Sequence, residues 1–408
     1  MLAKLSAEIR QYLIVTGNYW AFTLTDGALR MLVVLHFHQL GYSPLQIAML
    51  FLFYEFFGVV TNLVGGWLGA RVGLNRTMNI GLALQVVALS MLLVPSTMLS
   101  VIWVMAAQAL SGIAKDLNKM SAKSAIKLLV ADDAQATLYK WVAFLTGSKN
   151  TLKGVGFFVG GALLAWLGFQ GAVLAMAVAL AAVWIISLIF LKADLGKAKG
   201  KPKFRDIFSK SSAVNWLSGA RMFLFGARDV WFVVAIPVYF SSQLGWNPIG
   251  VSTFMAVWVI GYGVVQTIAP KLTGASSGQV PDGRSAFGWA LPLLSVTLLM
   301  ALGLWLQWPA EQVLVIGLLI FGALFAVNSS LHSYLIVSYA GRDGVSLDVG
   351  FYYMANAMGR LIGTILSGWV YQAYGLLPCL LVAAVFISLA ALFALALPVT
   401  ARAPEPDV

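Results

Sequence analysis

Twelve charged side chains of this sequence stand in stretches that are otherwise strongly apolar. Eight of them are basic, namely Arg30, Lys115, Lys119, Lys149, Lys153, Arg221, Arg228 and Arg360. Four are acidic, namely Asp26, Glu55, Asp116 and Asp229. A charge in apolar surroundings is costly unless it faces water or a partner. The surplus of four positive charges therefore predicts a wet cavity that attracts an anion.

The basic residue types suit an oxyanion such as a phosphate. Arginine binds phosphate oxygens through a planar fork of two hydrogen bonds, and lysine adds a mobile point charge. We predict that the substrate is held by Arg30, Lys149, Lys153, Arg228, Asn356 and Arg360. Lys115 and Lys119 stand at a spacing of four residues, and we expect them to attract the anion and contribute to its site. Lys123 and Lys127 continue this spacing, and Lys127 is expected to be solvated.

The four acids have two possible roles. Each can carry a proton that is exchanged for the substrate, or each can only neutralise a nearby cation. Glu55 has no basic neighbour in the sequence, which favours a proton carrier unless another helix supplies a cation. Asp26 precedes Arg30 by four residues, so the two share a helix face and can pair. Asp229 adjoins Arg228, but adjacent side chains on a helix point apart.

Several further residues have roles that the sequence leaves open. Arg221 lies about two turns from Arg228, where it can bind substrate or extend to the membrane interface. His332 can line the cavity or pack in a hydrogen-bonded core. His36 and His38 are expected at the interface near the end of the first apolar stretch.

Composition indicates the elements that must position these residues. Of 408 residues, 60% are hydrophobic and 10% are charged. Soluble domains have about 25% charged residues. Apolar stretches of about twenty residues indicate membrane-spanning helices, which satisfy their own backbone hydrogen bonds. Twelve are predicted, at 12–40, 44–70, 77–95, 99–126, 139–168, 171–191, 213–244, 249–270, 286–307, 312–338, 346–374 and 376–398. The expected fold is therefore an all-α polytopic membrane protein.

Basic residues in the connections predict the orientation of these spans. Connections with lysine or arginine alternate with connections that have none. The basic set holds Arg71, Arg76, Lys271, Arg284, Arg342 and the run over 192–210. The connections at 41–43, 96–98, 169–170, 245–248, 308–311 and 375 hold no lysine or arginine. Because basic loops stay in the cytoplasm, we expect a protein of the cell (inner) membrane with both termini cytoplasmic.

The chain repeats itself after half its length. Residues 39–44 (QLGYSP) match 243–248 (QLGWNP) at an offset of 204 residues. Residues 161–168 match 368–375 at an offset of 207, which aligns Lys149 with Asn356 and Lys153 with Arg360. The repeat predicts two pseudo-symmetric six-helix bundles, 1–191 and 213–408, joined by a basic linker over 192–212. Two such halves suit alternating access, with the site between them near the membrane midplane.

Signatures of other protein classes are missing from the sequence. Cys379 is the only cysteine, so there is neither an intramolecular disulfide nor a thiol cluster for a metal. We find no phosphate-binding loop, no pair of histidines spaced for a metal and no nucleophile elbow. We therefore expect no enzymatic activity, cofactor, metal or nucleic-acid partner. The expected partners are a small anionic substrate and the lipid bilayer.

Two motifs resemble those of the major facilitator superfamily. Residues 66–76 (GWLGARVGLNR) resemble the loop between its second and third helices, except that Ala70 replaces the usual aspartate. The glycines Gly154, Gly156, Gly160 and Gly161 resemble its glycine-rich antiporter motif without the proline. The resemblance implies a transporter fold, and the replacement at Ala70 puts the usual charge relay of that loop in doubt.

Three longer segments resemble the organoarsenical efflux branch of that superfamily, the ArsJ family. They are residues 17–30 (GNYWAFTLTDGALR), 111–123 (SGIAKDLNKMSAK) and 225–231 (FGARDVW). The resemblance implies an antiporter that exports 1-arseno-3-phosphoglycerate and confers arsenate resistance. It also implies a functional pairing with a glyceraldehyde-3-phosphate dehydrogenase that makes this compound. Two alternatives stay open: a carrier of another organic phosphate or dicarboxylate, and a non-transporting membrane sensor on the same fold.

Overall fold

The structure is a computed structural model that describes most of the chain. The described residues are 7–41, 50–95, 98–131, 133–191, 196–198, 211–246, 248–274 and 280–399. Most of the basic linker and parts of several connections lie outside them. All regular elements in the described part are helices. The all-α expectation is therefore confirmed.

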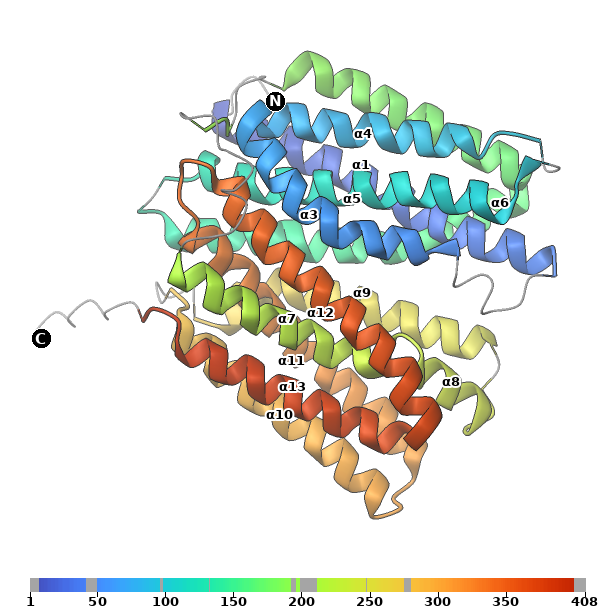
Figure 1. The fold of residues 1–408 in the computed structure, drawn as a ribbon, viewed down its shortest axis with the longest axis vertical. Coiled ribbons are helices and arrows are strands. Elements are labelled where there is room, and N and C mark those ends of the chain that lie inside the picture. Colours follow the sequence, from blue (N-terminus) through green and yellow to red (C-terminus); the bar gives the residue numbers. More distant parts are fainter. Residues whose placement is uncertain are drawn as a thin grey trace, which may run out of the picture.

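The helices follow one another with short connections (Figure 1). Their bounds are α1 (Ala7–Gln39), α3 (Leu52–Val72), α4 (Leu74–Met91), α5 (Val101–Leu129), α6 (Gln135–Phe190), α7 (Ser212–Phe232), α8 (Ala235–Ser242), α9 (Pro248–Leu272), α10 (Gly283–Trp305), α11 (Ala310–Tyr339), α12 (Val345–Tyr374) and α13 (Leu376–Leu395). Nine of the twelve predicted spans each correspond to one helix.

The other three spans differ in detail from the prediction. The spans predicted at 139–168 and 171–191 form the single element α6, which turns at Gly168. Gly168 has φ 66° and ψ −179°, a left-handed conformation that favours glycine. The span predicted at 213–244 is interrupted at residues 233–234 and forms α7 and α8.

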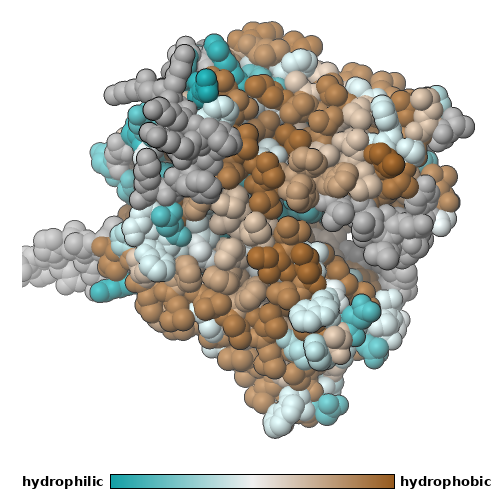
Figure 2. Space-filling view, viewed as in Figure 1, coloured by the Kyte–Doolittle hydropathy of each residue, from teal (hydrophilic) through white to brown (hydrophobic). Residues whose placement is uncertain are grey.

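Six helical stretches in the described part are long and apolar enough to cross a membrane by length and composition. They are Gln135–Phe190, Ser212–Ser242, Thr253–Leu272, Gly283–Trp305, Ala310–Tyr339 and Leu376–Leu395. The helices outside this set are α1, α3, α4, α5 and α12. All of them except α4 carry some of the twelve charged residues singled out above, seven in total. Figure 2 shows hydrophobic residues over the flanks of both halves, with hydrophilic residues mainly toward the ends.

The two halves use the same kind of internal contact. In the first half α1 packs on α6, where a Cβ added to Gly27 or Gly156 would meet the backbone of the other helix. In the second half α7 packs on α12, where Gly226 and Gly363 approach in the same way. Gly156 and Gly363 are related by the repeat offset of 207 residues. The sequence repeat is therefore a structural repeat, and the small residues allow close helix packing.

The halves meet through α3 against α12 and α6 against α9. We call the end that carries Arg71, Arg76, Lys271, Arg284 and Arg342 the basic end. In Figure 1 it lies at the left, where α1 begins and α13 ends, and the two halves diverge toward the right. The exact limits of the bundles and of the linker stay a prediction, because residues 192–195 and 199–210 lie outside the described part.

Contacts between the halves close the basic end. The Ser346 hydroxyl of α12 donates to the Gly66 carbonyl of α3 at 2.7 Å. Lys127 donates to the Ser338 carbonyl at 3.0 Å, and Arg342 to the Val130 carbonyl at 2.7 Å. Ala70 is buried beside this contact. Close helix packing and hydrogen bonds to backbone carbonyls thus contribute to holding this end. In the loop motif that residues 66–76 resemble, the aspartate that Ala70 replaces usually takes part in a charge relay.

Candidate functional site

A network of charged side chains joins the two halves beyond this closure. The Glu55 carboxylate of α3 bonds to Arg30 of α1 and to Arg360 of α12, both at 3.3 Å. Arg360 also donates through Nε to Asp229 of α7 at 3.2 Å. Asp229 in turn accepts from Arg228 Nε at 2.6 Å. We call these five residues the central network.

The central network faces open space on one side. The side chains of Arg30, Glu55 and Arg360 are 30%, 33% and 36% exposed, whereas that of Asp229 is only 1% exposed. Between described residues, no hydrogen bond or ion pair joins the halves farther from the basic end than the Glu55–Arg360 pair. The three exposed members can therefore exchange partners with a ligand that enters from the open end.

The pairing within the network differs from the pairing that sequence neighbours suggest. Arg30 pairs with Glu55, and no ion pair joins it to Asp26. Glu55, which lacks a basic neighbour in sequence, has two arginine partners from other helices. The expectation that Arg228 and Asp229 point apart is wrong, because the long arginine side chain folds back onto the adjacent carboxylate.

Asp26 stands apart from the network as a buried carboxylate with a neutral partner. It accepts hydrogen bonds from the Tyr54 hydroxyl at 2.7 and 3.0 Å. Among the described residues it forms no ion pair within 4 Å. The Tyr54 ring also lies under two cations, with Arg30 at 4.9 Å and Lys115 at 3.8 Å from its centre. Tyr54 was not singled out from the sequence, although its position next to Glu55 in an apolar stretch was a signal.

Two of the lysines on α5 share one acid. Asp116 accepts from Lys119 at 2.6 Å and lies 3.9 Å from Lys115. Lys119 also lies over the Tyr353 ring of α12, 4.5 Å from its centre. Both lysines are partly exposed near the central network, and their contribution to the site stays a prediction. Asp116 therefore lies between two cations and can balance the charge of one of them.

Two lysines of α6 lie nearby without an acid partner. Lys149 donates to the neighbouring Asn150 at 3.2 Å. Lys153 forms no ion pair with any described residue. The charged groups that interact with it over longer distances are the cations Arg30, Lys149 and Lys115 and the acids Asp26 and Glu55. The repeat mate of Lys149, Asn356, is buried with no partner for its amide nitrogen. The predicted substrate ligands therefore converge from α1, α6, α7 and α12.

A polar contact between the halves adjoins the α6 lysines. Asn150 donates to Gln266 of α9, and Gln266 donates to the Tyr262 hydroxyl at 2.9 Å. Asn150 and Tyr262 were not singled out from the sequence, because isolated polar residues in apolar stretches are common. The contact fixes α6 beside α9 and so helps to position Lys149 and Lys153.

One expectation about the basic residues nearer the basic end is wrong, and one open alternative is decided. Lys127 is buried, because the close approach of the second half covers it at the contact with Ser338. Arg221 is also buried, and it donates to the carbonyl and hydroxyl of Ser329 at 3.1 and 3.2 Å instead of extending to the interface. His332 is buried beside it.

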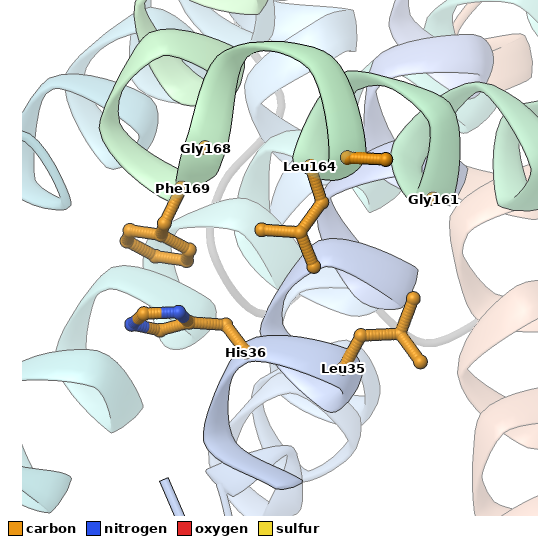
Figure 3. Close-up of a pocket in the computed structure, with 7 residues that line it drawn as sticks. Leu35, His36, Gly161, Leu164, Gly168 and Phe169 are labelled. Atoms are coloured by element: carbon orange, nitrogen blue, oxygen red, sulfur yellow. The ribbon is translucent and has the colours of Figure 1, made fainter. Parts of the chain in front are cut away.

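A separate pocket lies at the turn of α6 (Figure 3). It has a volume of about 440 Å³ and is lined by Leu35, His36, Gly161, Leu164, Ala165, Gly168 and Phe169. The His36 ring stacks on Phe169 with 4.1 Å between ring centres. The side chain of His38 lies outside the described residues. This lining holds none of the charged site residues, so the pocket is distinct from the central network.

In the described part of the chain, no three His, Cys, Asp or Glu residues gather as a metal site. The arrangement instead offers exposed guanidinium and ammonium groups from both halves, with carboxylates that occupy some of them. Such a set can bind a small oxyanion by exchanging carboxylate for ligand oxygens.

Comparisons with known proteins bear on the fold and the family. Residues 13–275 match the model of the Major Facilitator Superfamily. No curated protein sequence matches the chain. The structure is similar to the human organic anion transporter MFSD10 (TETRAN), with a TM-score of 0.76 and 16% identity over 96% of this chain and 100% of that one.

Two further similar structures come from transporters in an outward state. A Major Facilitator Superfamily transporter, FucP, in the outward conformation has a TM-score of 0.73 and 12% identity over 95% of this chain and 99% of that one. A bacterial homologue of the iron transporter ferroportin in an outward-facing state has a TM-score of 0.73 and 12% identity, over 95% and 98%. Since the family model matches well over half of the sequence and the folds agree, the chain belongs to the Major Facilitator Superfamily.

Proposed function

We propose that this transporter exports a small phosphorylated organic anion by alternating access. The observation that carries the proposal is the convergence of Arg30, Lys153, Arg228 and Arg360 from both halves on one partly exposed region. A two-headed anion suits it, because each half can supply cations to one head. Arginine forks and lysine point charges are the groups that bind such oxyanions.

The substrate we favour is 1-arseno-3-phosphoglycerate. Support comes from the resemblance of residues 17–30, 111–123 and 225–231 to the ArsJ family and from the excess of cations at the site. Its phosphate and arsenate groups would be the two heads. The same resemblance supports a role in arsenate resistance, in functional partnership with a glyceraldehyde-3-phosphate dehydrogenase.

We further propose that the basic end faces the cytoplasm of a bacterial-type inner membrane. The predicted connections at the opposite end hold no lysine or arginine, which supports cytoplasmic termini. The bundles 1–191 and 213–408 and the linker 192–212 belong to the same proposal. On this orientation the structure is closed to the inside and open to the outside. A reporter fused after residue 408 should be active only in the cytoplasm, and activity only outside would contradict the orientation.

Proton antiport is the coupling that we propose, with Asp26 as the carrier. Glu55, Asp116 and Asp229 each form ion pairs, so protonating any of them would break a salt bridge. Asp26 forms no ion pair with a described residue, and its partner, the Tyr54 hydroxyl, can keep a hydrogen bond to a neutral acid. Asp26→Asn should therefore abolish the dependence of transport on a pH gradient. If only Glu55→Gln abolished it, the carrier would be Glu55.

Uptake into everted vesicles tests the function directly. Vesicles that contain the protein should accumulate radiolabelled 1-arseno-3-phosphoglycerate, and a pH gradient should change the rate. 3-Phosphoglycerate should compete, whereas non-phosphorylated glycerate should not. Equal competition by unphosphorylated dicarboxylates would favour a general anion carrier. Absence of both uptake and counterflow in folded protein would favour a membrane sensor.

A further inference from the structure

Three basic side chains form a second group, nearer the basic end than the central network. They are Lys123 of α5, Arg221 of α7 and His332 of α11, and none is more than 3% exposed. Lys123 lies about one turn beyond Lys119, and Arg221 about two turns before Arg228. We call these three residues the inner cluster.

The hydrogen-bonding capacity of the inner cluster is only partly used. Lys123 Nζ, Arg221 Nε and His332 Nδ1 are buried and have no hydrogen-bond partner among the described residues. The bonds that Arg221 does make go to the neutral carbonyl and hydroxyl of Ser329. The cluster therefore has no acid bound to it, in contrast to the central network.

The charged groups that act on the inner cluster are all positive. The charges that act on Lys123 are Arg221, Lys149 and Lys119, all of them positive. The charge that acts on His332 is again Arg221. Buried polar groups are normally paired, and a buried cation surrounded by cations is unfavourable without a counter-ion. An oxyanion carries several acceptor oxygens and would meet these donors together.

We infer that the inner cluster is a second oxyanion subsite, which takes a phosphate-like group as it passes between the central network and the basic end. The inference rests on the proposed transport of a phosphorylated anion. Lys123 belongs to the first half, and Arg221 and His332 belong to the second. The subsite is therefore shared between the two halves. When the halves separate there, an anion that has passed the cations of the basic end meets this cluster before it reaches the central network.

Transport measured separately from each membrane face tests this subsite. The probe is 3-phosphoglycerate, and its half-saturating concentration is measured in everted and in right-side-out vesicles that contain the full chain. Lys123→Met should raise this concentration about tenfold from the basic face and less than about twofold from the opposite face, since one charged hydrogen bond is lost on one side only. Lys123→Arg keeps the charge and should restore most of the affinity at the basic face.

The matched comparison is Lys153→Gln, which should weaken transport from both faces. Lys123→Met removes an uncompensated buried charge and is expected to fold. Equal effects of Lys123→Met at both faces would overturn the subsite, and so would unchanged values at both. In the latter case Lys123 would serve packing alone, and the methionine variant would be at least as stable as the parent.

A binding measurement separates failure of the subsite from failure of the proposed function. Equilibrium dialysis of radiolabelled inorganic phosphate against detergent-solubilised Lys153→Gln protein, with and without Lys123→Met, requires no transport. If vesicles transport no phosphorylated anion, the proposed function fails. Weaker phosphate binding in the double variant would then still support the subsite, whereas equal binding would overturn it.

Discussion

Lys153 and Arg360 occupy equivalent places in the two halves, but their surroundings differ. Arg360 bonds to two carboxylates, Glu55 of the first half and Asp229 of the second. Lys153 has no ion pair among the described residues, and most charges near it are positive. The repeat therefore determines the position of each cation. The acids on neighbouring helices determine whether that cation is held in an ion pair. In the first half, Lys153 can bind an anion directly. In the second half, Arg360 can bind one only after it gives up a bond to a carboxylate.

The largest expected effect comes from Arg360→Gln. The change removes one cation and leaves Glu55 and Asp229 less neutralised, so they repel an incoming anion. We expect the affinity for 3-phosphoglycerate to fall about a hundredfold, as measured by direct binding to purified protein. Arg360→Lys should recover only part of the loss, because a point charge cannot replace the fork between two carboxylates.

The control for this change is Arg10→Gln, an exposed arginine of α1 that should have parental affinity. Folding is checked by thermal unfolding of each variant. Near-parental affinity in folded Arg360→Gln would mean that the arginine only holds the halves together. Arg360 would then not be a substrate ligand equivalent to Lys153.

A smaller effect is expected from Lys153→Gln, which removes a cation but breaks no ion pair between described residues. The affinity for 3-phosphoglycerate should fall about tenfold, because one charged hydrogen bond is lost. Lys140→Gln, at an exposed position on the same helix, is the matched control. If the two variants bound equally well, Lys153 would serve helix packing, and the free charge of the first half would have to be Lys149.

The smallest effect, and one of opposite sign, is expected when Asp229→Asn is added to Arg360→Gln. The double variant should bind about threefold more tightly than the single variant, since the Asp229 carboxylate no longer repels the anion. The same binding assay compares the single and double variants. The double variant should unfold at the same temperature as the single variant. If its affinity does not recover, Asp229 does not compete with the ligand.

Several parts of the site could be predicted from the sequence, because they depend on local properties. Lys149 and Lys153 were identified as charges in apolar stretches, and the repeat offset placed Lys153 opposite Arg360. The partners of the charges could not be predicted in the same way. Asp26 and Arg30 satisfy the helix spacing for a pair, yet Arg30 bonds to Glu55, which is 25 positions away in the sequence. Lys127 looked solvated because its burial depends on Ser338 in the other half.

The sequence by itself determined the class of this protein, its helices and its internal repeat. Those properties follow from hydropathy and from small residues such as Gly156 and Gly363, which act within one helix or at one close contact. Only the tertiary structure decided which end is closed and which charges are paired. The physical reason is that an ion pair acts over a few ångströms in space. Helix packing brings Glu55 to Arg360 across 305 positions of the chain, and Lys153, one repeat away, receives no such partner in the described part.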